Sequence, residues 1–192
     1  MSYKLPPANQ LSTVPRPQLI EALNHLFEPC PTLSSLLISK VFSGGLTYPD
    51  YPEMIERCRE ELLQYLGLAD LEAYGSGTAV NPDVSKIIAA HPRLGQSAPN
   101  KTEKLSAHSS QEQRSLQGSE EESRKLNELN EQYEATFPGL RYVVFVNGRP
   151  RSVIMQNMID RINRNDISQE RRDAFNAMCD IALDRAKKLN SV

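Results

Sequence analysis

Apolar residues recur at the spacing of an amphipathic helix along most of this chain, and at the spacing of a strand in one place only. The clearest case is "DYPEMIERCREELLQYLG", where apolar side chains share one broad face, Asp50 is placed to cap the start and Gly67 stands at the end. Proline and glycine punctuate the remaining chain at intervals typical of helices joined by short loops. The one extended stretch, within "RYVVFVNGRP", is too short and isolated to build a sheet.

These patterns predict an all-α fold, a single-domain bundle of about eight helices with one short extended connector near residues 142–147. The length of 192 residues suits one domain with a buried core. The start of the chain is rich in Pro, Asn and Ser. It predicts a flexible N-terminal arm over residues 1–16 and a helical domain over residues 17–192.

Charge and cysteine usage exclude several classes of function. Lys and Arg number 22 against 24 Asp and Glu, and a net charge of -2 gives no reason to expect nucleic acid as a partner. No apolar run approaches the roughly eighteen residues of a membrane helix, and no signal-peptide pattern opens the chain, so we expect no membrane partner and a cytoplasmic location. A peroxisomal location stays open, although the final "NSV" is not a Ser-Lys-Leu type of signal. Three widely spaced cysteines predict reduced thiols.

His91 is the first candidate for chemistry. In "NPDVSKIIAAHP", an Asn cap and Pro82 at the first helical position predict a helix that ends at His91, because Pro92 disfavours its continuation. An imidazole at such a helix end can exchange protons near neutral pH. The alternative is a structural role, in which an imidazolium interacts with the helix dipole.

A second group of polar residues follows in "HSSQEQ". Ser109 and Glu112 have the spacing of a capping box, which would be a purely structural explanation, but Gln113 adds an amide that a cap does not require. His108 and Glu112 lie four residues apart, so together with His91 they form an alternative metal site. A cap at Ser109 would leave His108 outside the helix, and we therefore predict no metal.

Arg161 lies late in a helix predicted over residues 151–163, beside a stripe of apolar side chains. It is either a surface residue or an anchor for an anionic substrate, because a guanidinium pairs with a carboxylate through two parallel hydrogen bonds.

The order of these pieces resembles the 2-oxo-4-hydroxy-4-carboxy-5-ureidoimidazoline (OHCU) decarboxylase family. The resemblance is carried by "HPxL", "SxxEQ", "LNxxYxxxF" and "xVVFVxGR", with an "LFE" in the first helix, and it covers Leu19 to Leu189. It implies an all-helical enzyme without a cofactor, usually a homodimer, that converts OHCU to (S)-allantoin and CO2 in urate (purine) degradation. Such a decarboxylation needs no cofactor because the substrate's own ring accepts the electrons.

The resemblance also implies roles for individual residues. The catalytic residues it implies are His91 and Glu112, and the family's substrate-binding arginine falls on Arg161, with Arg164 as a nearby alternative. The substrate-binding residues that it implies are Pro92, Ser109, Gln113 and Arg161.

The chain departs from the family pattern in places. Arg114 and Ser115 follow "EQ" where Ala-Gly is common, and a longer segment, residues 65–80, precedes the histidine helix. The alternative function is therefore a catalytically drifted or inactive family member that acts as a ureide-binding or interaction module. Release of CO2 would distinguish this alternative from the enzyme.

Overall fold

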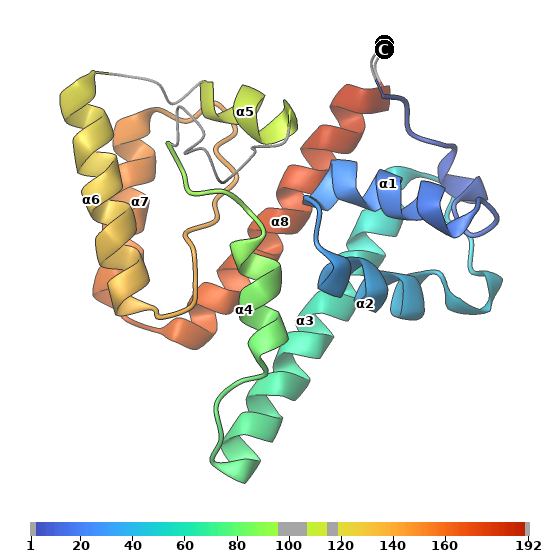
Figure 1. Cartoon of the computed structure of the whole chain (residues 1–192), viewed down its shortest axis with the longest axis horizontal. Helices are drawn as coiled ribbons and strands as arrows, with labels where there is room; N and C mark the ends of the chain where they lie inside the picture. Colours follow the sequence, from blue (N-terminus) through green and yellow to red (C-terminus); the bar gives the residue numbers. More distant parts are fainter. Residues whose placement is uncertain (1–2, 96–106, 115–118, 191–192) are drawn as a thin grey trace.

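The computed structural model describes residues 3–95, 107–114 and 119–190, without the side chains of Ser110, Gln113 and Arg114. Within these ranges there are eight α-helices, two 3-10 turns and no strand, so the all-α prediction is confirmed (Figure 1). The expected extended segment lies in the non-helical connector between the sixth and seventh helices. The elements are η1 (Ala8–Gln10), α1 (Arg16–Phe27), α2 (Pro31–Val41), η2 (Ser43–Gly45), α3 (Tyr51–Ser76), α4 (Pro82–Ala89), α5 (Ala107–Arg114), α6 (Glu120–Thr136), α7 (Arg151–Arg164) and α8 (Ile167–Asn190).

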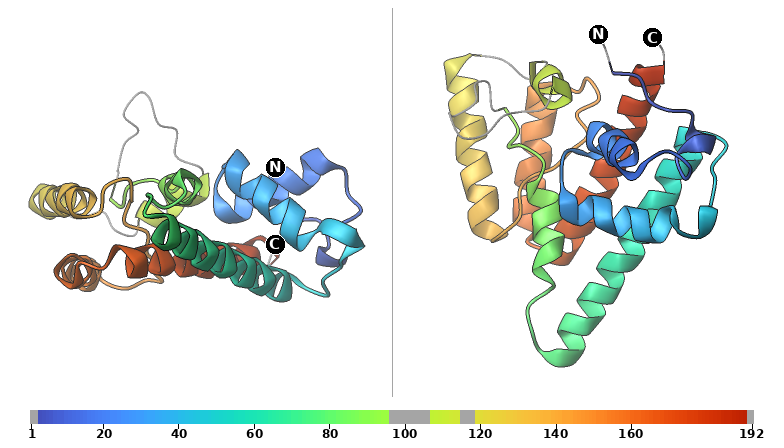
Figure 2. Two further views of the ribbon diagram at one scale, coloured as in Figure 1. Left: turned by 90° about the horizontal axis from the view of Figure 1, so that it is seen from below. Right: turned by 45° about the vertical axis from the view of Figure 1, so that its right-hand side comes forward.

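Helices α3 and α8 are the longest and make the most extensive helix–helix contact. Helices α1 and α4 also pack on α8, and α2 packs on α3 and α4. On the other side of the molecule, α6 and α7 lie side by side (Figure 2). The short helix α5 lies between these two groups, near the C-terminal half of α8 (Figure 1).

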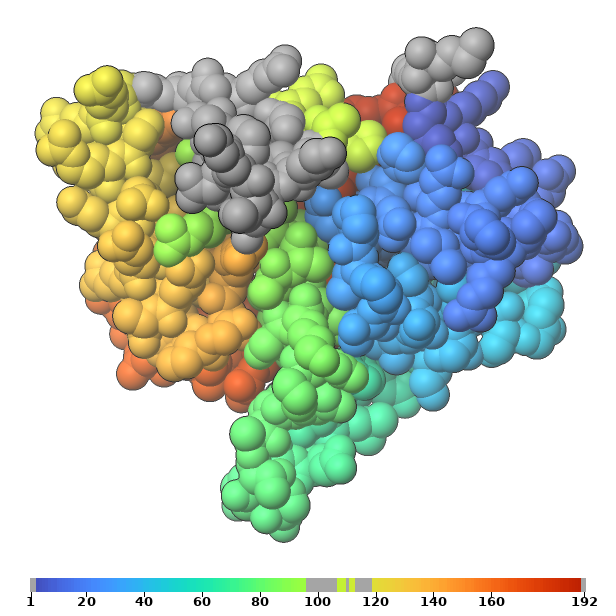
Figure 3. Space-filling model, in the orientation of Figure 1, coloured from blue at the N-terminus to red at the C-terminus, as the bar shows by residue number. Residues whose placement is uncertain are grey.

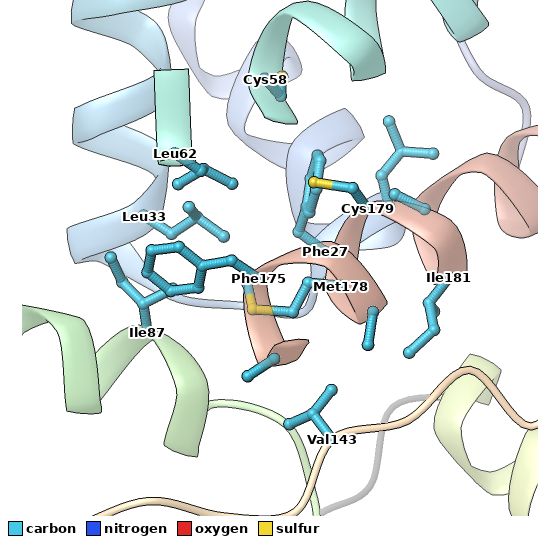
Figure 4. Close-up of a cluster of buried hydrophobic side chains, with 14 of the residues drawn as sticks. Phe27, Leu33, Cys58, Leu62, Ile87, Val143, Phe175, Met178, Cys179 and Ile181 are labelled. Atoms are coloured by element: carbon cyan, nitrogen blue, oxygen red, sulfur yellow. The ribbon is translucent and has the colours of Figure 1, made fainter. Parts of the chain in front are cut away.

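The core is centred on α8. Phe175 and Met178 of α8 have no exposed surface, and they lie among Leu62 of α3, Ile87 of α4 and Val143 of the connector (Figure 4). Burying each large apolar side chain contributes about 1.5–3 kcal/mol relative to exposure. This packing fixes the position of α8, and the same helix also contributes to the candidate functional site.

Helix α3 starts as predicted but ends later. The Asp50 carboxylate accepts a hydrogen bond from the Glu53 N–H at 2.9 Å, whereas the helix passes through Gly67 and stops only at Gly77, which has a φ of 67°. Glycine inside a helix costs only about 1 kcal/mol relative to alanine, and Ala69 still packs in the core beyond it. The end of α3 and the start of α4 therefore project from the rest of the molecule (Figure 3). Exposed apolar side chains on this projection are Leu68, Leu71 and Tyr74.

The N-terminal segment was expected to be a flexible arm, and its described part is packed instead. Leu5 and Leu11 are buried in the core, and the Tyr51 hydroxyl donates a hydrogen bond of 2.6 Å to the Pro6 carbonyl. Apolar side chains among the prolines thus dock the segment before α1 begins. In the described ranges, no helix has both the length and the apolar character needed to cross a membrane.

Candidate functional site

His91 stands two residues beyond the last residue of α4. The helix begins as the sequence predicts, because the Asn81 side chain accepts from the Asp83 N–H at 3.0 Å and Pro82 occupies the first turn. His91 is only 4% exposed, and neither ring nitrogen has a hydrogen-bond partner among the described residues. A buried polar group without a hydrogen-bond partner lowers the free energy of unfolding by about 1–3 kcal/mol. A residue with a purely structural role rarely carries such a cost.

The imidazole of His91 is held in its neutral form. Burial lowers its pKa to about 4, the nearby Glu28 carboxylate opposes this shift, and the Arg185 guanidinium adds to it. A neutral ring at pH 7 does not fit the alternative in which an imidazolium serves the helix dipole. His91 therefore lies within electrostatic reach of one buried carboxylate and one buried guanidinium.

The chain on either side of Pro92 is fixed by two arginines. Arg141 donates a hydrogen bond of 3.1 Å to the His91 carbonyl. Arg93 donates two hydrogen bonds to the Glu134 carboxylate on α6, one of them 3.0 Å long. Pro92 itself is half-buried between these anchors. The position of the imidazole is thus set by the connector and by α6 as well as by α4.

A tight turn completes this segment. The Asn130 side chain donates a hydrogen bond of 2.9 Å to the Leu94 carbonyl, and Gly95 follows with a φ of 78°. A Cβ atom at position 95 would overlap the side chain of Leu126, which is itself buried. Glycine is required here both by the backbone conformation and by the close approach of α6.

Arg185 of α8 is the centre of the polar cluster. Its Nε and Nη2 atoms donate two parallel hydrogen bonds to the Glu112 carboxylate, at 2.8 Å and 2.9 Å. Nη2 also donates to Glu28 at 2.9 Å, and Nη1 donates to the Leu26 carbonyl at 3.4 Å. Arg185 is only 2% exposed, so these bonds form away from bulk water. One guanidinium therefore joins α8, α5 and the end of α1.

Arg185 keeps its charge in this environment. Burial alone would lower its pKa, but the hydrogen bonds and charges of Glu112 and Glu28 outweigh burial and raise the pKa above the ordinary value. The cluster thus holds a permanent cation between two carboxylates.

Ser109 and Glu112 lie on the same side of α5. The Ser109 hydroxyl donates a short hydrogen bond to the Glu28 carboxylate and lies 3.4 Å from Nη2 of Arg185. Ala107 and His108, which precede Ser109, are already helical, so Ser109 is not the N-cap and the capping-box explanation at this position is wrong. Glu112 is the more accessible of the two, with 30% of its side chain exposed. The side chain of Gln113 lies outside the described part of the structure.

Glu28 has an unusual backbone. It follows the last residue of α1 with φ 84° and ψ 148°, a region that residues other than glycine rarely adopt. Strain of this kind costs on the order of 1–3 kcal/mol and tends to occur at functional sites. The side chain is only 4% exposed. In the sequence, Glu28 stands out only as part of "LFE", although a carboxylate flanked by Phe27 and Pro29 at a helix end is a usable signal.

His108 pairs with another histidine. Nε2 of His108 lies 3.0 Å from Nδ1 of His25 on α1, and burial lowers the pKa of both rings. The alternative metal site of His91, His108 and Glu112 is not assembled in the described part of the structure. Among the described residues, no group of three or more His, Cys, Asp or Glu side chains is placed to hold a metal ion.

Arg161 lies in a different environment. Its Nη1 donates a hydrogen bond of 3.3 Å to the Val143 carbonyl, and its guanidinium lies 4.9 Å from the centre of the Tyr142 ring and 3.5 Å from Glu170. It lines a hollow of about 260 Å³ together with side chains of the connector and α8. Arg164 donates to Glu170 at 2.6 Å. As a substrate-binding residue, Arg161 stays a prediction.

The guanidinium that reaches Glu112 is that of Arg185, a residue that was not among those predicted from the sequence. A signal was present, because Arg185 lies seven residues after Met178 on the inward stripe of α8, where a charged residue needs a partner. The assembled site thus contains a neutral imidazole, a partly exposed carboxylate and a fixed guanidinium. Such a set can hold an anion and move a proton.

Comparison with known proteins identifies the family of the chain. No curated protein matches the chain. The model of the family described as OHCU decarboxylase matches residues 12–187, which include every helix from α1 through most of α8. Because this match spans nearly the whole chain, the protein belongs to the OHCU decarboxylase family.

Proposed function

We propose that this protein converts OHCU to (S)-allantoin and CO2 in the degradation of urate. The observation that carries the proposal is the buried, neutral imidazole of His91, without a partner among the described residues, within electrostatic reach of Arg185, which binds Glu112. A proton-transfer group beside an anion-binding group is what decarboxylation of an anionic substrate requires.

Substrate binding would use Arg185. The guanidinium presents Nε and Nη2 in the geometry that suits a carboxylate, and it now holds Glu112 in that way. The substrate's carboxylate would take over one or both of these hydrogen bonds. Pro92 would form part of the wall beside His91, while Ser109 and Gln113 would bind polar groups of the ring and the ureido chain.

The bond between ring carbon C4 and the carboxylate breaks, and CO2 leaves. The electron pair of that bond forms a C4=C5 double bond, and the π pair of the C5=N bond moves onto nitrogen, which takes up a proton from solvent, to give an enol. The enol then loses its hydroxyl proton to become the C4 carbonyl, while C5 receives a proton. Delivery to one face of C5 fixes the S configuration of allantoin.

His91 and Glu112 would carry the second proton transfer. Glu112, released from Arg185, would accept from the C4 hydroxyl, and His91 would deliver the proton to C5. Because burial lowers the pKa of His91 to about 4, the ring is neutral before each turnover and gains its proton from the substrate or from Glu112. Positioned proton transfer of this kind contributes about 10²–10⁴-fold to rate.

We further propose that the protein acts as a homodimer without a cofactor, which rests on membership of the family. Light scattering coupled to size exclusion would give twice the mass of 21.6 kDa for a dimer.

The test is to generate OHCU in situ from urate and to follow the circular dichroism of allantoin. The wild-type protein is expected to accelerate formation of the S enantiomer over the spontaneous racemic decay. His91→Asn and Glu112→Gln are expected to lower the rate by about 10²-fold or more. Glu61→Gln is the matched control, because Glu61 pairs with Arg57 at 2.6 Å on α3.

Each outcome has a definite meaning. Loss of activity in both site variants, with native far-UV spectra and an active control, supports the enzyme. If the wild type adds nothing to the spontaneous rate but allantoin or OHCU shifts its melting temperature, the ureide-binding alternative replaces the enzyme.

A further inference from the structure

The hydrogen bonds of Arg185 divide into two groups that differ in accessibility. Two bonds go to Glu112 on α5, whose side chain is 30% exposed. The others go to buried acceptors: the Leu26 carbonyl and the Glu28 carboxylate at the end of α1, the latter 4% exposed, and the buried Ser109 hydroxyl at 3.4 Å. One side of the guanidinium therefore faces a replaceable ligand, and the other faces a buried one.

An anion that binds Arg185 from solvent must compete with the accessible carboxylate. When Glu112 gives up its two hydrogen bonds, the guanidinium would lose its only bidentate partner among the described residues. An arginine side chain has several rotatable bonds, and holding it in one position against that freedom requires a second fixed acceptor. Glu28 is the charged acceptor that remains.

Glu28 has a second contact that supports the same role. Its carboxylate accepts the hydroxyl hydrogen bond of Ser109, so it also holds the buried side of α5. The backbone of Glu28 is strained, with a φ of 84°, and this conformation places the carboxylate between Ser109 and Arg185. A glutamate that served only to end α1 would not require either contact.

We propose that Glu28 is a positioning residue, which keeps Arg185 and Ser109 in place while Glu112 releases Arg185 to the carboxylate of the substrate. This inference rests on the proposed function for the identity of the incoming anion. The claim that Glu28 holds Arg185 in position when Glu112 no longer binds it does not depend on any enzymatic activity.

The first experiment therefore uses no substrate. Nitrogen-15 spectra of labelled arginine report rotation about the Nε–Cζ bond, because a held guanidinium shows separate Nη signals and a released one shows a single averaged signal. The wild type, Glu112→Gln and the double variant Glu28→Gln/Glu112→Gln are compared, and Arg185→Lys identifies the signals. Separate signals are expected in the first two proteins and averaging in the double variant. Averaging already in Glu112→Gln, or separate signals in the double variant, would overturn the proposal.

The double variant buries a guanidinium without either carboxylate, and circular dichroism detects whether the fold is lost. In that event Glu28→Asp replaces Glu28→Gln in the Glu112→Gln background. The shorter side chain keeps the charge but withdraws the carboxylate from Nη2, so Nη exchange should be faster than in Glu112→Gln alone. Equal exchange in these two proteins would contradict the proposal.

The second experiment measures turnover of OHCU by Glu28→Gln. Weaker retention of Arg185 reduces binding of the substrate in the ground state and the transition state alike, so KM should rise by about tenfold or more while kcat changes by less than about threefold. Glu61→Gln removes a carboxylate from an arginine elsewhere on the molecule and should leave both constants unchanged. A fall in kcat at constant KM, or no change at all, would contradict a positioning role.

The two experiments separate the two proposals. If the wild type does not act on OHCU, the proposed function fails, and the nitrogen-15 comparison still decides whether Glu28 holds Arg185. If the wild type is active and the comparison fails, only the role of Glu28 is withdrawn.

Discussion

Arg185 and Glu112 form two parallel hydrogen bonds, of 2.8 Å and 2.9 Å, between α8 in the core and the short helix α5. The pair joins residues 73 positions apart in the chain. The same guanidinium also lies within electrostatic reach of His91. Arg185 therefore supports both the fold and the proposed site.

Replacement of Arg185 by methionine should be strongly destabilising. The variant keeps most of the apolar stem but leaves Glu28, only 4% exposed, without its cation. Removing one partner of a buried ion pair costs about 3–5 kcal/mol. Urea denaturation measures the loss, and Arg57→Met, at an arginine with a 42% exposed side chain, should cost no more than about 1 kcal/mol. A similar loss in the free energy of unfolding for both variants would show that the Arg185 cluster does not stabilise the folded state.

Substitution of Glu28 tests the backbone strain separately from the charge. Glu28→Ala and Glu28→Gly both remove the carboxylate, but only glycine adopts φ 84° and ψ 148° without strain. We expect the glycine variant to be more stable than the alanine variant by about 1–2 kcal/mol, after allowance for the greater freedom of glycine in the unfolded chain. Thermal and urea unfolding of the two proteins make the comparison. An alanine variant as stable as the glycine variant would argue that the backbone relaxes at this position.

The free energy of unfolding should fall in mild acid because of His91. Its pKa is lowered to about 4 in the folded protein from 6.5, so the unfolded chain binds more protons between these values. The contribution of His91 is complete above about pH 6.5 and is lost as the pH falls toward 4, by up to roughly 3 kcal/mol. Urea unfolding at several pH values measures the slope, and His91→Asn should flatten it. An unchanged slope in that variant would assign the pH dependence to other groups.

Gly95→Ala should destabilise the protein by about 2–4 kcal/mol, because alanine disfavours a φ of 78° and its Cβ would overlap Leu126. Activity toward OHCU should fall as well, since this turn fixes the segment that follows His91. The double variant Gly95→Ala/Leu126→Ala should lose less stability than the sum of the single variants, because the new methyl group partly fills the space left by leucine. Strict additivity would show that the two positions do not interact.

The fold was predictable from local signals, and the site only in part. Periodicity and caps predicted the helices, and the caps Asp50 and Asn81 each accept the expected backbone hydrogen bond. The end of α3 was missed because Gly67 looks like a stop, whereas packing beyond it continues the helix. His91 and Glu112 were visible as residue types in a local order, but their common neighbour Arg185 is distant in the chain. The sequence marks Arg185 only as a charged residue on an apolar stripe of α8, and it carries no local sign of which residues Arg185 contacts.

Helix α5 has a consequence for the order in which the molecule opens. It spans eight residues, and of its described side chains only Ser109 is buried. So short a helix is not stable alone, and polar contacts with Arg185, Glu28 and His25 hold it in place of an apolar face. Local opening free energies are lowest where apolar burial is least, so amide hydrogens of α5 should exchange with solvent well before those of α3 and α8. We thus expect one half of the site to lie on the slowest-exchanging part of the protein and the other half on a segment that opens without unfolding the core.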